Sequence, residues 1–162
     1  TRTAEREYLT TLDLGRTVRD AVRLVLRSLG EPLDAVPVEA PEGLVVHART
    51  SEVQQVFVNL VKNAIEAEDG TEGVRVRVCR DDGHLEARVV DTGPGIPEDV
   101  RMQVFDPFFT TKEPGKGTGL GLNIVYRIVT RHRGTVHVED TAGGGATFVV
   151  RLPAGDAAEE TR

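Results

Sequence analysis

The sequence is poor in the features that cross-link a fold or anchor it in a bilayer. It contains one cysteine, Cys79, which excludes an internal disulfide and suits a reducing, cytoplasmic compartment. No apolar run approaches the ~20 residues that a membrane-spanning helix requires, and no signal-peptide pattern opens the chain. We therefore expect a cytoplasmic domain without direct membrane contact, and a membrane-anchored parent protein stays compatible with this.

Positive charge is also scarce. The chain has 20 Lys and Arg residues against 26 Asp and Glu residues, a net charge of −6. This argues against binding to nucleic acid, and a polyanion could bind only where positive groups are concentrated locally. The 162 residues are 39% hydrophobic and 28% charged, which fits one soluble domain whose core needs no disulfide or metal.

Apolar spacing predicts helices and antiparallel hairpins in blocks, which is typical of a two-layer α/β sandwich. Helices are predicted at residues 14–29, closed by Gly30, at 51–68 with Ser51 as N-cap, and from 122 to about 134. Strands are predicted at residues 44–48, 74–80, 85–90, 135–139 and 146–152. We place the domain at residues 12–153, after a linker or helix end (1–11) and before a disordered polar tail (154–162). The chain starts without Met, so a fragment of a longer protein is expected.

Asp91 is the first candidate site residue. It follows a strand in which Leu85, Ala87 and Val89 share one face, so the two-residue period turns Asp91 inward as well. Gly93 and Gly95 come next and let the backbone turn sharply beside a flat ligand. An inward carboxylate there would accept a hydrogen bond from an adenine amino group, or would cap the turn that follows.

Three further segments carry candidate chemistry. Asn59 and Asn63 lie four apart on one face of a helix, where amide oxygens suit Mg²⁺, or are two surface asparagines. Residues 115–122 are glycine-rich and open a helix, which favours anion binding, but they match neither a P-loop nor a dinucleotide fingerprint. Three of the five phenylalanines fall in residues 105–112. This segment is either a small cluster under a loop or a lid that offers Lys112 to a phosphate.

The order of these four segments resembles the N, G1, F and G2 boxes of histidine kinase catalytic domains in the GHKL superfamily. The matching residues are 54–64, 91–96, 105–112 and 117–122, and 145–148 with 152–153 resemble the closing strand of that family. The resemblance implies a Bergerat-type sandwich, with a mixed, mostly antiparallel sheet on about three helices and a mobile ATP lid. Glu66 and Ala67 stand where many members have a Lys and an aromatic residue, as in the nitrogen-regulation type.

The same resemblance implies the roles of the site residues. Asn63 would ligate Mg²⁺ with Asn59 near the phosphates, Asp91 would receive the adenine amine, and Gly93, Gly95 and Ile96 would shape its slot. The phosphates of ATP would be held by Thr111, Lys112, Lys116, Gly117, Thr118, Gly119, Leu120 and Gly121.

The implied activity is transfer of the γ-phosphoryl group of ATP to a histidine in two-component signalling. None of His47, His84, His132 and His137 sits in a phosphoacceptor context, so the chain should contain no catalytic nucleophile. The acceptor helices of a homodimer and a downstream response regulator are the expected partners. The alternatives are a GHKL ATPase, an anti-sigma-type serine kinase, or a degenerate module that binds no nucleotide. Related ATPases carry a basic glutamate at the place of Asn59, and an amide cannot deprotonate water.

Overall fold

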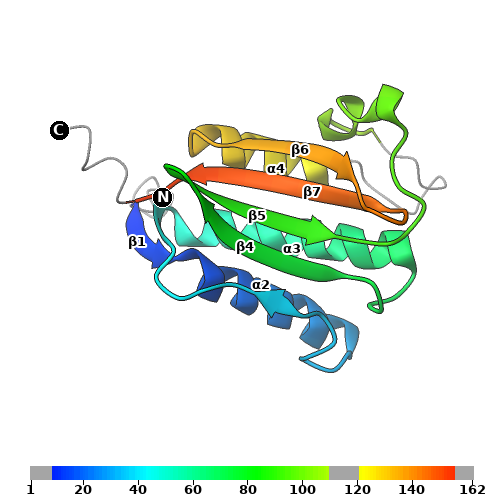
Figure 1. Ribbon diagram of the computed structural model, residues 1–162, viewed down its shortest axis with the longest axis horizontal. Helices are drawn as coiled ribbons and strands as arrows, with labels where there is room; N and C mark the ends of the chain where they lie inside the picture. The colour runs from blue at the N-terminus through cyan, green and yellow to red at the C-terminus, as the bar shows by residue number, and fades with distance from the viewer. Residues whose placement is uncertain (1–8, 110–120, 156–162) are drawn as a thin grey trace, which may run out of the picture.

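The computed structural model describes residues 9–109 and 121–155, and its elements form two layers (Figure 1). Three helices cover one face of a five-stranded sheet: α2 (Leu14–Leu29), α3 (Thr50–Glu68) and α4 (Gly121–Arg131). The sheet has the order β2-β4-β5-β7-β6, and its strands are β2 (Val38–Glu39), β4 (Arg75–Asp81), β5 (His84–Val90), β7 (Ala146–Pro153) and β6 (Thr135–Asp140). Only the β2–β4 pair is parallel among the described strands, so the predicted mixed, mostly antiparallel sandwich is confirmed.

Helix α3 occupies the centre of the helical layer and packs against both α2 and α4. Its predicted apolar stripe is buried in full: Val53, Val56, Phe57, Leu60 and Ala64. Each large side chain of such a stripe contributes about 1.5–3 kcal/mol through the apolar area it removes from water. The predicted Ser51 N-cap is wrong, because the helix begins at Thr50. The capping residue is Arg49, which provides no side-chain cap and instead donates its N–H to His132 Nε2.

Helix α2 has a cap at each end. The Asp13 carboxylate accepts the N–H of Arg16, and this hydrogen bond lowers the pKa of Asp13. Gly30 closes the helix in the left-handed region, with φ of 70°, as the sequence predicts. Leu29 was expected in the apolar stripe but lies half-exposed at the last turn, beyond the reach of the core.

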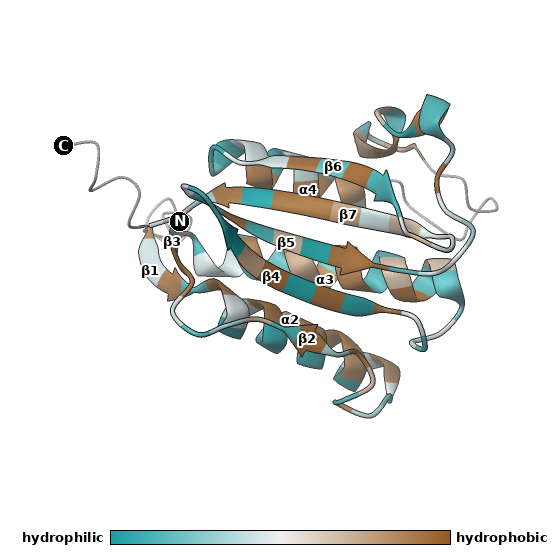
Figure 2. Ribbon diagram, in the orientation of Figure 1, coloured by the Kyte–Doolittle hydropathy of each residue, from teal (hydrophilic) through white to brown (hydrophobic). Residues whose placement is uncertain are grey.

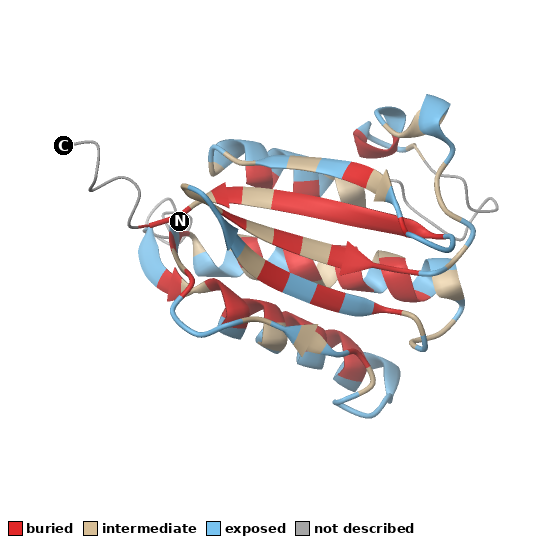
Figure 3. Ribbon diagram, in the orientation of Figure 1, coloured by how far each residue is buried: buried red, intermediate tan, exposed pale blue. Residues whose placement is uncertain are grey.

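The β4–β5 hairpin shows the predicted alternation of buried and exposed residues (Figures 2 and 3). Val74, Val76 and Val78 are buried while Arg75 and Arg77 are exposed. The buried apolar residues of the strands and the helices form one cluster, so the core lies between the two layers. The opposite face of the sheet carries the arginines.

Both ends of the domain extend beyond the predicted limits of residues 12–153. Thr10 and Thr11 belong to β1 (Thr10–Asp13), which pairs antiparallel with β3 (Val45–Ala48). At the other end Ala154 is buried and donates its N–H to Gly83, while Gly155 donates to Val45. Strand β1 was missed because its four residues are mostly polar and show no apolar pattern. Residues 1–8 and 156–162 lie outside the described part of the chain.

Candidate functional site

Asp91 is turned into the core, as the strand period predicts, and only 1% of it is exposed. The N–H groups of Gly93 (3.0 Å) and Ala146 (3.2 Å) both donate to its Oδ1 atom. Within residues 9–109 and 121–155, no hydrogen bond reaches Oδ2. Burial raises the pKa of Asp91, and the nearby negative charge of Glu68 adds to this effect, while the two N–H donors oppose it. The site thus presents a basic carboxylate oxygen to a ligand that donates a hydrogen bond.

The backbone beyond Asp91 is held tightly. A Cβ atom placed on Gly93 would lie 2.6 Å from the carbonyl oxygen of Ala67 at the end of α3. Any larger residue at this position would therefore clash. Gly95 has φ of 79°, a conformation that favours glycine. Ile96 is half-buried and its carbonyl accepts Arg101 Nε at 3.2 Å. The two glycines are therefore required by the protein's own packing and turn geometry.

Asn59 and Asn63 are both half-buried on α3, at the edge of the apolar stripe. Asn59 accepts Gln55 Nε2 (2.6 Å) and donates to the carbonyl of Gly121 (3.1 Å), which is the first residue of α4. Asn59 thereby joins α3 to the start of α4. The Asn63 amide has no hydrogen bond to any described residue, so it is available to a ligand.

The residues around Asn63 fit Mg²⁺ better than a softer metal. The described residues contain no group of three His, Cys, Asp or Glu side chains able to hold a metal ion. An ion at this place would depend on an amide oxygen, water and the oxygens of a ligand. Mg²⁺ accepts such a set, since it keeps several waters and binds phosphate oxygens.

The phenylalanine segment divides into two parts. Phe105 is buried, packs edge-on against Phe148 with ring centroids 6.2 Å apart, and has its carbonyl held by Asn123 Nδ2. Phe108 is 72% exposed with φ of 66°. The small-cluster interpretation is therefore right for Phe105, which belongs to the core, so the lid interpretation of residues 105–112 does not apply to its first residue.

Most of the predicted phosphate-binding residues lie outside the described part of the chain. These are Thr111, Lys112, Lys116, Gly117, Thr118, Gly119 and Leu120. Gly121 is described, and it opens α4 beside the Asn59 amide. The roles of these residues stay predictions.

Glu68 is a residue that sequence reasoning missed. As the last residue of α3, it accepts the N–H and the hydroxyl of Thr92, the latter at 2.8 Å, and the N–H of Gly73 at 2.7 Å. Burial opposes its ionisation, but these donors outweigh burial and lower the pKa of Glu68. One signal in the sequence could have found it: a carboxylate at a helix C-terminus is disfavoured by the helix dipole unless other donors hold it.

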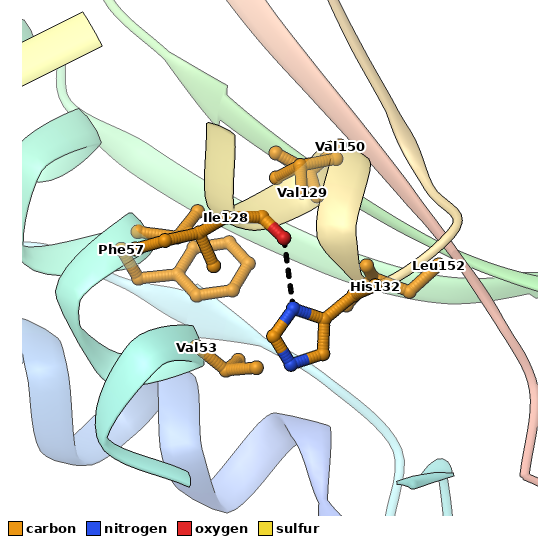
Figure 4. A pocket seen from close by; sticks show the side chains of 8 residues that line it. Val53, Phe57, Ile128, Val129, His132, Val150 and Leu152 are labelled. Carbon is orange, nitrogen blue, oxygen red and sulfur yellow. Dashed lines mark hydrogen bonds between the residues drawn. The ribbon is translucent and has the colours of Figure 1, made fainter. Parts of the chain in front are cut away.

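A small apolar hollow lies between α3, α4 and β7 (Figure 4), and none of the predicted site residues lines it. His132 is its polar member. Its Nδ1 donates to the carbonyl of Ile128 at 2.8 Å, because its Nε2 already accepts the N–H of Arg49 at 3.2 Å. His132 therefore links the ends of two helices, in agreement with the expectation that it is a structural histidine.

Comparison with known proteins identifies the family. A sequence profile described as "Histidine kinase-, DNA gyrase B-, and HSP90-like ATPase" matches residues 48–156, two thirds of the chain. The chain belongs to this family of ATPases. Its members include the histidine kinases that the four boxes resemble, and ATP is the nucleotide that the family name implies.

Within this family, the individual proteins to which the chain is similar are sensor histidine kinases. The two-component sensor PprA of Pseudomonas aeruginosa is 41% identical over 143 residues, covering 81% of this chain and 15% of PprA. The catalytic domain of histidine kinase ThkA superposes with a TM-score of 0.78 at 31% identity, covering 95% of this chain and 99% of that domain. The sensory histidine kinase/phosphatase NtrB of Rhodobacter capsulatus is 40% identical over 115 residues, covering 63% of this chain and 32% of NtrB.

The chain spans less than a third of the length of the curated relatives named above. The match to NtrB gives weak support to the predicted nitrogen-regulation subtype, because the chain is equally similar to PprA over a longer stretch. Separately, the described helices include none of the length and apolar character needed to cross a membrane.

Proposed function

We propose that this chain binds Mg-ATP and donates the γ-phosphoryl group to a histidine on a separate phosphoacceptor domain. The observation that carries the proposal is the Asp91 carboxylate. It is buried at the end of β5, fixed through Oδ1, and open to a donor at Oδ2. The exocyclic amine of adenine supplies such a donor, and the adjacent Gly93 and Ile96 would line the flat slot for the base.

At the phosphate end the proposal depends on α3 and the start of α4. Asn63 would ligate Mg²⁺, and Asn59, held against Gly121, would lie beside the phosphates. The positive charge would come from Lys112 and Lys116, and the N–H groups of residues 117–121 would contact phosphate oxygens at a helix N-terminus. When bound, Mg²⁺ neutralises phosphate charge and orients the transferred group.

Transfer to a protein histidine is favoured over rapid hydrolysis of ATP. A water molecule needs a base, and the side chain at position 59 is an amide already engaged with Gln55 and Gly121. Each of the four histidines is engaged elsewhere in the fold. His47 contacts Thr11, His84 begins β5 beside the hairpin turn, His137 contacts Glu139, and His132 joins two helices. We therefore place the acceptor on the helices of a partner domain, in a cytoplasmic homodimer that passes the phosphoryl group to a response regulator.

The test of the binding site is the Asp91→Asn variant. The new amide can still accept the N–H groups of Gly93 and Ala146, but it turns a donor toward the adenine amine. We expect calorimetry to show ATP affinity reduced about 10- to 100-fold, the range for losing a hydrogen bond to a charged group. Thermal stability should not fall, because burial no longer opposes a charge at this position.

Asp82→Asn is the matched control, since it replaces the same side chain by the same amide in an exposed turn. Asn tolerates the φ of 56° at this position. This variant should bind ATP as the unmodified protein does. If Asp91→Asn also retains full affinity while folded, Asp91 does not anchor the base.

A further inference from the structure

The Glu68 carboxylate joins three segments that are far apart in the sequence. Its Oε1 accepts both the N–H and the hydroxyl of Thr92, in the turn after β5, and its Oε2 accepts the N–H of Gly73, just before β4. Thr92 is the residue directly after Asp91. The end of α3 is therefore tied to the backbone that carries the base-anchoring carboxylate.

The space around this carboxylate leaves little freedom. A Cβ on Gly73 would overlap the Thr92 hydroxyl and the Glu68 carboxylate. On the other side of Thr92, Gly93 lies against the Ala67 carbonyl and donates its N–H to Asp91 Oδ1. Loss of the Glu68 contacts would release Thr92 and, with it, the N–H that fixes the orientation of Asp91.

Charge acts in the same place. Glu68 is the charged side chain that raises the pKa of Asp91 after burial, and Arg75 of β4 acts on Glu68 and favours its ionised form. The groups that approach Asp91 from the β6–β7 side are neutral: the Ala146 N–H and the Thr141 hydroxyl, which binds the Asp91 carbonyl. A more basic carboxylate is a stronger hydrogen-bond acceptor, so Glu68 strengthens the acceptor as well as positioning it.

We propose that Glu68 is a positioning residue that sets the preference of the site for a base with an exocyclic amine. It acts through Thr92 and Gly93 on the Asp91 carboxylate and does not touch the nucleotide. The proposal rests on the proposed ATP site, and it explains why that site would prefer adenine to a base without the amine.

The test compares ATP with inosine triphosphate, which lacks the amine, in the unmodified protein and in Glu68→Gln. The Gln side chain keeps one acceptor oxygen, loses the charge, and turns an NH₂ group toward a backbone N–H. We expect ATP affinity to fall about 10-fold and inosine triphosphate affinity to change less than about twofold. The pH at which ATP affinity is lost on acidification should move lower, because Asp91 ionises more readily without a negative neighbour.

Glu72→Gln is the control, since it removes a carboxylate one residue from Gly73 in an exposed position. It should retain both the ATP preference and the pH profile. If Glu68→Gln does not fold, Thr92→Ala removes one donor and keeps the charge, and it should reduce the preference about threefold with an unmoved pH profile.

Three results are distinguishable. If Glu68→Gln lowers the affinity for both nucleotides equally and leaves the pH dependence of ATP affinity unchanged, Glu68 only stabilises the fold. That result would overturn this inference. An unchanged preference in a folded variant would overturn it too. If the unmodified protein binds neither nucleotide, or binds both equally, the proposed base anchor fails instead.

Discussion

Asp91 is a single residue at which stability and ligand binding conflict. Its pKa is raised chiefly by burial, so folding shifts the carboxyl group toward its protonated form relative to the unfolded chain. The resulting contribution to stability is complete below the unfolded pKa of the carboxyl group and is lost as the pH rises through the folded pKa. ATP binding has the opposite dependence, because only the ionised carboxylate accepts from the adenine amine without competing as a donor. Hydrogen bonding by the proposed adenine amine would therefore offset part of the cost of burying the ionised carboxylate.

Asn63 gives a second prediction at the scale of one residue. Its amide has no hydrogen bond to a described residue, so Asn63→Ala should leave the fold intact. The gain in ATP affinity produced by Mg²⁺ should shrink about 10-fold or more, in line with the loss of a group that supports a metal site. Calorimetric titrations with and without Mg²⁺ measure this gain.

The control for Asn63 is Gln54→Ala, which removes an amide from the opposite side of the same helix. It should preserve the full Mg²⁺ effect. An undiminished effect in Asn63→Ala would show that the ion is held by other groups.

Residues differ in how far the sequence alone could place them. The inward direction of Asp91 follows from the two-residue period, and the border position of Asn59 and Asn63 follows from the helical one. The contacts of Glu68 could not be derived this way, because they join positions 68, 73 and 92, which come together only after the sheet pairs. Ser51 was misplaced as a cap because Ser suits both a cap and the first turn of a helix, and the helix begins one residue earlier, at Thr50.

Among the elements, the long ones were predictable, while of the short strands β3 was predicted and β1 and β2 were not. Helix α3 and the β4–β5 hairpin extend over enough residues for a period to be visible. Strand β2 has two residues, and its parallel pairing with β4 depends on the path of the chain after α2. The β5–β7 pairing brings Ala146 to Asp91 across more than 50 residues. The register of such a pairing cannot be predicted from the local sequence of either strand.

The lid is the element whose motion can be tested. We extend the predicted lid from residues 105–112 to Gly117, at the glycine-rich segment, and exclude Phe105, because Val104 and Phe105 are core residues and Asn123 holds the Phe105 carbonyl. We expect hydrogen exchange at residues 106–117 to be fast without nucleotide and slower with Mg-ATP, because docking of the lid buries its backbone. Val104 and Phe105 should be protected in both states.

The β4–β5 hairpin is the internal reference for this measurement, since its exchange should not respond to nucleotide. Equally strong protection of residues 106–117 with and without Mg-ATP would refute a mobile lid.

At the scale of the whole molecule, the nucleotide site and the phosphoryl acceptor are expected on different domains. Transfer needs a nucleophile in line with the leaving oxygen, and most of the catalysis is positioning and neutralisation of charge. We predict that the 162-residue chain binds ATP without labelling itself and that acceptor helices, fused or added in trans, restore transfer. Incubation with γ-labelled ATP and Mg²⁺ should yield an acid-labile, base-stable label only when those helices are present.

The matching control replaces the acceptor histidine of those helices by Gln, which should abolish the label. Strong labelling of the chain by itself would reveal an overlooked nucleophile. Rapid phosphate release from it would reveal an overlooked base and favour the ATPase alternative.

The short β1–β3 sheet also has a mechanical consequence. Both described ends of the chain are held by β3, because β1 pairs with it and Gly155 donates to Val45. Only Arg49 separates β3 from α3, so the connection has no slack. Any pull on either end is therefore delivered to one end of a rigid rod of roughly 28 Å, whose far half carries Asn63 and finishes at Glu68. A small tilt of α3 imposed at its first residue would therefore displace Asn63, the proposed magnesium ligand, together with Glu68.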